Sequence, residues 1–107
     1  MLTRTFKILL ISLLLISSLT ASVADSAKDM LAAGRIDDAI AELDGRLSSA
    51  PADAESSNLL CRAYYTLEDW GRAEPACRKA VALAPNNSRF HLWLGRVYGR
   101  GAAVFLR

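Results

Sequence analysis

Cys61 and Cys77 are the only cysteines of the chain, and their spacing would suit a disulfide bond. If the residues between them form two antiparallel helices that turn near Glu68 and Asp69, the two cysteines lie level with each other. A bridge there would close a short loop and stabilise the fold by about 3 kcal/mol. The alternative is two small buried thiols, because helix axes about 8–10 Å apart strain a disulfide. The sequence leaves both interpretations open.

His91 is the only histidine and the other candidate for chemistry. A catalytic histidine needs a nucleophile or carboxylate placed by a recognisable motif, and the sequence contains none. The cysteines and the histidine also lie far from zinc-site spacing, and no glycine-rich phosphate loop is present. We therefore predict no catalytic residue, no metal site, no cofactor and no enzymatic activity. His91 is expected near the start of a helix, partly exposed.

The residues around the cysteines predict two helices, Ala54–Leu67 and Trp70–Leu83, because apolar side chains recur there at helical spacing. The side chains expected to face inward are Leu59, Leu60, Ala63, Tyr64 and Leu67 of the first helix, and Trp70, Ala73, Cys77, Ala80 and Val81 of the second. Ala73 and Ala80 are small enough to let the two helices approach closely.

The chain also repeats itself at a constant step of 34 residues. Residues of similar type separated by this step are Ile36 and Trp70, Ala39 and Ala73, Leu43 and Cys77, Pro51 and Pro85, Leu60 and Leu94, and Tyr64 and Tyr98. Such self-similarity is typical of stacked helical hairpins.

In this spacing the chain resembles the tetratricopeptide repeat family. Its third copy, Leu94-Gly95-Arg96-Val97-Tyr98, carries the L-G-x-x-Y core of that family. The resemblance covers about Asp25 to Gly99. It implies an all-α fold of antiparallel helix-turn-helix repeats, an α-solenoid of about two and a half repeats.

The expected domain plan has a first repeat at residues 25–53, a second at 54–87, an incomplete third at 88–99 and a tail at 100–107. The first repeat should contain a short helix over Asp25–Ala33 that ends at Gly34, followed by an amphipathic helix with its apolar stripe from Ile36 to Leu47.

The first helix of the third repeat is expected to end near Tyr98, because Gly99 and Gly101 would each cost a helix about 1 kcal/mol. Leu94, Val97 and Tyr98 would then form an apolar face that nothing covers.

The resemblance also implies a concave binding surface built from the first helix of each hairpin. The matching positions are Asn58, Arg62 and Tyr65 in the second repeat, and Arg89, Trp93 and Arg96 in the third. Three arginines and two aromatic rings would suit an extended peptide that bears carboxylates. The family's chaperone-binding carboxylate clamp is not expected, because Leu59 stands where that pattern has Asn. The alternative is that Tyr65 and Trp93 only pack against neighbouring helices.

Residues 1–24 have the pattern of a secretory signal peptide. Arg4 and Lys7 precede the apolar run Ile8–Leu19, and Ser22 and Ala24 are the small residues expected before a cleavage site. We therefore expect an exported protein, periplasmic or secreted. An uncleaved membrane anchor is the alternative, since residues 8–24 carry no charge.

Charge in the remaining chain is divided along its length. All eleven acidic residues lie between Asp25 and Glu74, whereas the chain from Pro75 onward has six basic residues and no acidic one. This asymmetry indicates an anionic partner or a solvated helix face. Nucleic acid is not expected, because the chain without its leader would be neutral and exported.

The leading functional hypothesis is an exported adaptor that binds a protein or peptide segment, one bearing acidic groups, in its concave groove. One alternative is an assembly subunit that completes its third hairpin on another copy of itself. Another is a truncated product of a longer repeat gene.

Overall fold

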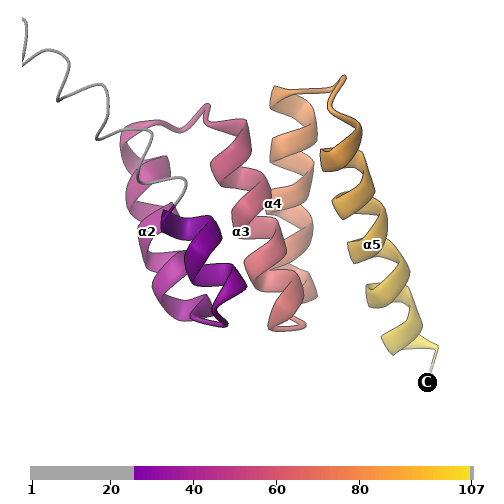
Figure 1. Ribbon diagram of the computed structural model, residues 1–107. Coiled ribbons are helices and arrows are strands. Elements are labelled where there is room, and N and C mark those ends of the chain that lie inside the picture. The colour runs from indigo at the N-terminus through magenta and orange to yellow at the C-terminus, as the bar shows by residue number, and fades with distance from the viewer. Residues whose placement is uncertain (1–25, 107) are drawn as a thin grey trace, which may run out of the picture.

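A computed structural model of the chain describes residues 26–106. The predicted signal peptide, residues 1–24, lies outside the described residues. The described part consists of helices joined by short turns and contains no strand. In order they are a short helix over residues 26–32, α2 (Ile36–Ser49), α3 (Ala54–Thr66), α4 (Trp70–Leu83) and α5 (Ser88–Phe105). Successive helices run antiparallel, and Figure 1 shows α2, α3, α4 and α5 following one another across the molecule with the short first helix in front of α2 and α3. The all-α hairpin architecture predicted from the sequence is therefore present.

The 34-residue repeat is visible in the backbone of the turns. Gly34 and Glu68 are one repeat apart, and both adopt the left-handed conformation, with φ of 77° and 56°. Glycine adopts this region freely, but a side chain makes it unfavourable by about 1–2 kcal/mol. The turn geometry is thus imposed by the packing of the hairpins, since it forms with either residue.

The helix starts repeat in the same way. Asp53 and Asn87 are the N-cap residues of α3 and α5, and each side chain accepts a hydrogen bond from a backbone N–H of the first turn. Asp69 caps α4 by accepting from the Arg72 N–H at 3.2 Å. These side chains satisfy donors that have no partner inside the helix.

Asp53 also joins α2 to α3. Its carboxylate receives the Arg46 guanidinium at 2.9 Å and the Ser56 hydroxyl at 2.9 Å. Burial opposes the ionisation of this carboxyl group. The hydrogen bonds from Arg46 and Ser56, with the Arg46 charge, outweigh that effect and hold the pKa of Asp53 below its usual value.

The core follows the repeated small residues. Ala39 and Ala73, one repeat apart, are fully buried, and so is Ala80. Cys61, Tyr64, Cys77 and Val97 fill the space between α3, α4 and α5. A second cluster of Ala27, Leu43 and Leu59 joins the first helix to α2 and α3. α3 therefore lies at the centre of the array, and its side chains reach every other helix.

The predicted end near Tyr98 of the first helix of the third repeat is wrong. α5 continues through Gly99, Arg100 and Gly101 to Phe105, so residues 100–105 are helix rather than a tail. The Cα of Gly101 lies against Trp70, where an added Cβ would be in ordinary contact at 3.8 Å. Packing on α4 thus outweighs the low helix propensity of the glycines.

Two predictions about single side chains are also wrong. Val97 was expected on an uncovered face but is 2% exposed, because it points into the cluster between α4 and α5. Leu67 was expected to face inward but is 48% exposed. It lies at the C-cap of α3, where the chain has already turned away from the hairpin interior.

Candidate functional site

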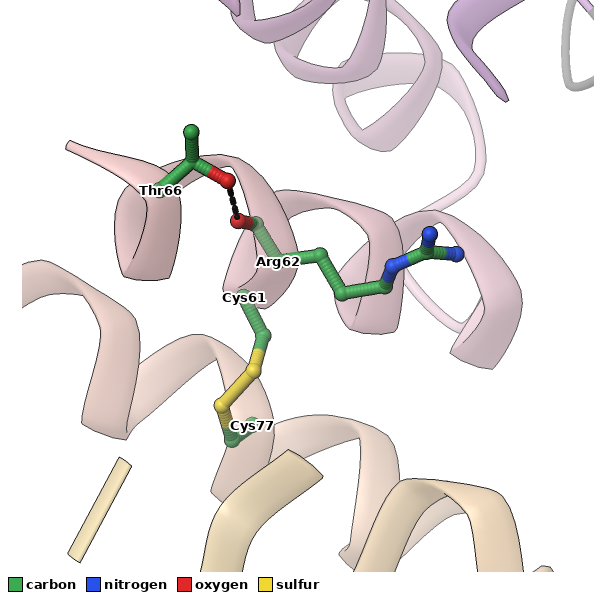
Figure 2. The surroundings of a disulfide bond; sticks show 4 residues. All are labelled: Cys61, Arg62, Thr66 and Cys77. Carbon is green, nitrogen blue, oxygen red and sulfur yellow. Dashed lines mark hydrogen bonds between the residues drawn. A yellow bond between two sulfur atoms is a disulfide. The ribbon is translucent and has the colours of Figure 1, made fainter. Parts of the chain in front are cut away.

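Cys61 of α3 and Cys77 of α4 form a disulfide bond in the structure. Their Cα atoms are 5.0 Å apart, within the usual range for a bridge, and both residues are fully buried. The bond crosses directly between the two helices, as Figure 2 shows. Helices that approach at alanine can come closer than average helix axes do, which is why the spacing is no obstacle here. The bridge is an internal staple of the hairpin and has no access to a substrate.

Three of the predicted groove residues come together around one ring. The guanidinium carbons of Arg62 and Arg96 lie 5.0 Å and 4.6 Å from the centre of the Trp93 ring. Cation–π contacts of this kind contribute about 0.5–1 kcal/mol at exposed sites and hold the charges in position. The Arg62 side chain extends along α3 and away from the disulfide (Figure 2). The guanidinium groups of Arg62 and Arg96 therefore place two positive charges beside the Trp93 ring.

The position one repeat before Arg62 is also basic. Lys28, Arg62 and Arg96 follow one another at the 34-residue step, on the first helix, α3 and α5. Lys28 and Arg62 line a cavity of about 140 Å³ together with Leu31, Thr66 and Trp93. Lys28 and Leu31 were not among the predicted site residues. The sequence could have identified Lys28, because it lies one 34-residue repeat before Arg62.

The charge on this surface is incompletely neutralised. Lys28 forms an ion pair with Glu55 at 3.7 Å. Within residues 26–106, neither Arg62 nor Arg96 forms an ion pair with a carboxylate. We name the set Lys28, Arg62, Trp93 and Arg96 the basic ladder. Such a surface attracts anionic groups and offers a flat apolar ring beside them.

Asn58 does not belong to this surface, and its predicted place in the groove is a correction. The residue is 0% exposed, and neither its amide oxygen nor its amide nitrogen has a hydrogen-bond partner in the described structure. The i, i+4, i+7 spacing from Asn58 to Tyr65 gives a direction around α3 but not what covers it. The neighbouring helices bury Ser56, Ser57, Asn58 and Leu59 in the first turns of α3, whereas Arg62 and Tyr65 further along the helix are only partly buried.

Tyr65 acts as a packing residue between three helices. Its ring meets Trp70 of α4 and Trp93 of α5 edge to face, with centroids 5.5 Å and 5.4 Å apart. Such pairs are worth about 0.5–1.5 kcal/mol beyond the area they bury. Tyr65 is half-buried and packs against Trp93, so its contribution to the basic ladder is indirect.

Arg89, the remaining predicted groove residue, is already paired. Its guanidinium lies 2.6 Å from the carboxylate of Glu55, which also receives Lys28. Arg89 therefore helps to join α5 to α3 and offers little free charge to a ligand.

His91 lies in the first turn of α5 and is exposed, as the sequence indicated. Its Nε2 donates to the carbonyl oxygen of Pro85 at 2.6 Å, which ties the helix to the preceding turn. The described residues contain no group of three or more histidines, cysteines or carboxylates placed to hold a metal ion. Across residues 26–106, none of the helices has the length and apolar character needed to cross a membrane.

Comparison with known protein families identifies the array. Two overlapping segments, residues 25–88 and 59–102, match the tetratricopeptide repeat family. The matches extend over most of the chain and coincide with the stacked hairpins, so the protein belongs to this family. Tetratricopeptide repeats generally mediate protein–protein interactions, and the family is typically non-catalytic. No curated protein matches the chain.

Proposed function

We propose that the protein is an exported adaptor that binds an acidic segment of another protein across the basic ladder. The observation that carries the proposal is the pair of arginines on Trp93, both without a carboxylate partner in the described structure. Arg62 and Arg96 would make bidentate contacts with carboxylates, and Trp93 would receive an apolar side chain between them. The 34-residue step places one basic residue on the first helix of each successive repeat, which suits an extended segment.

Two observations support export. Residues 1–24 have the order of charge, apolar run and small residues that is typical of a signal peptide. Disulfides persist in oxidising compartments, and the hairpin contains one at its centre. Periplasmic or extracellular location follows if the leader is cleaved, and an N-terminal membrane anchor follows if it is retained.

The binding proposal is tested by titration with a short fluorescent peptide of alternating Asp and Leu, read by anisotropy. The matched peptide contains Asn in place of Asp. We expect the acidic peptide to bind, the Asn peptide to bind much more weakly, and affinity to fall as salt is raised.

Charge-reversal variants locate the site. Arg62→Glu and Arg96→Glu should each weaken binding at least tenfold with unchanged helical circular dichroism. Lys79→Glu is the control, since Lys79 is an exposed residue of α4 outside the basic ladder. Equal losses for all three variants would contradict the proposed site. Preferential binding of single-stranded DNA over the acidic peptide would contradict the proposed ligand class.

A further inference from the structure

A second surface, separate from the basic ladder, lies between the start of α4 and the second half of α5. It is an open groove of about 810 Å³. Its apolar lining includes Leu67, Trp70, Tyr98 and Val104, two of which are half exposed or more: Tyr98 at 50% and Val104 at 56%. An apolar hollow of this size is typical of a binding site.

The α4 side of the groove is acidic. Glu68, Asp69 and Glu74 all line it, and no lysine, arginine or histidine does. Asp69 is paired with Arg72 at 2.7 Å, and Glu74 approaches Arg78 and the Tyr98 hydroxyl only at 3.5 Å. Glu68 has no ion-pair partner among residues 26–106. An occupant of the groove should therefore combine apolar side chains with positive charge.

α5 itself has this composition. The helix contains no acidic residue, and next to the groove it exposes Arg100. Just past its last turn, Leu106 is 88% exposed. Gly99, Gly101, Ala102 and Ala103 leave its second half slim, so another helix can approach its backbone closely.

We propose that the occupant is α5 of a second copy of the chain. The two copies would pair about a two-fold axis with their α5 helices antiparallel, so that each α5 lies in the α4–α5 groove of the other. A two-fold interface requires a surface that is complementary to itself. Here α5 of each copy lines its own groove with apolar residues and also enters the groove of the other copy with its basic and apolar residues. The acidic residues at the start of α4 supply the opposite charge, once in each copy. This pairing does not depend on peptide binding at the basic ladder.

The proposal is tested by sedimentation equilibrium of the purified chain and its variants. We expect a reversible dimer of the unmodified protein. Val104→Glu should leave a monomer with the same helical circular dichroism, because the side chain is exposed and its change need not disturb the fold. Leu92→Glu is the matched control: Leu92 is an exposed residue of the same helix that does not line the groove, and this variant should still dimerise.

Charge reversal tests the direction of the pairing. Glu68→Arg and Arg100→Glu should each weaken self-association about tenfold, because like charges then face each other across both halves of the interface. A mixture of the two variants should associate as a heterodimer, since opposite charges meet at both places again.

Three results would overturn the pairing. These are a monomer at all concentrations, a dimer that Val104→Glu does not affect, and a mixture of charge variants that associates no better than either alone. Arg62→Glu should abolish peptide binding without changing the dimer. Failure of one proposal is thus distinguishable from failure of the other.

Discussion

Glu55 and Arg89 occupy the same position in successive repeats and form an ion pair at 2.6 Å. The residues are 34 positions apart, so the repeat step places an acid on α3 opposite a base on α5. Lys28 contacts the same carboxylate from the first helix. One glutamate thus connects three helices on the surface that carries the basic ladder.

Removing this connection should cost little stability, because both side chains are partly exposed. We expect Arg89→Gln to lower the free energy of unfolding by about 0.5–1 kcal/mol. A double-mutant cycle with Glu55→Gln, measured by urea denaturation, gives the coupling energy. The exposed Arg35–Asp38 pair of α2 serves as the comparison and should show a smaller coupling. Equal couplings for the two pairs would mean that the Glu55 network has no special role.

The left-handed turn at Gly34 can be tested with a pair of alanine substitutions. Gly34→Ala should lower the free energy of unfolding by about 1 kcal/mol, because alanine is unfavourable at a φ of 77°. Gly45→Ala should raise it by about 0.8–1 kcal/mol, since Gly45 lies inside α2 with nothing within 4 Å of the added Cβ. Thermal unfolding followed by circular dichroism measures both. Changes of the same sign would contradict the assigned turn.

Asp53 should make stability depend on pH. The folded protein holds the pKa of this carboxyl group below its usual value, so the unfolded chain binds the proton more tightly. Its contribution is present above the ordinary aspartate pKa of about 3.9 and is lost as the pH falls through the lower pKa of the folded state. For the unmodified protein, the urea concentration at the midpoint of unfolding should fall as the pH is lowered through this range. The Asp53→Asn variant should be less stable at neutral pH and should lose less on acidification.

Of all these interactions, the disulfide should contribute most to the free energy of unfolding. Replacing both Cys61 and Cys77 by alanine, or reducing the bridge, should lower the free energy of unfolding by about 3 kcal/mol, as expected for a loop of this length. The measurement is chemical denaturation with and without a reductant, and the double alanine variant should be insensitive to the reductant. A reductant effect on that variant would show that the bridge is not its cause.

The fold was predictable because the repeat step specifies the packing several times over. Ala39 and Ala73 are both buried, and Asp53 and Asn87 both cap helices, so each repeat provides the evidence for the next. The end of α5 was not predictable in this way. Helix propensity penalises Gly99 and Gly101, and only the position of Trp70 shows that Gly101 lies in a packed contact.

The site was predictable only in part. The resemblance to the tetratricopeptide repeat family brought Arg62, Trp93 and Arg96 together, because it assigns the first helix of each hairpin to one concave surface. It placed Asn58 there as well, although the residue is buried, since neither the resemblance nor helical spacing says what the neighbouring helices cover. The disulfide also remained undecided, because the distance between α3 and α4 depends on how closely the alanines let them approach.

The covalent link between α3 and α4 divides the array into parts of unequal stiffness. In a tetratricopeptide array held only by side-chain packing, each helix can shift relative to the next, because each repeat contacts only its neighbours. In this protein the central junction cannot open while the bridge is intact. A force that pulls the two ends of the array apart would therefore separate α2 from α3 or α4 from α5 first. The disulfide-linked hairpin of α3 and α4 would move as one rigid unit.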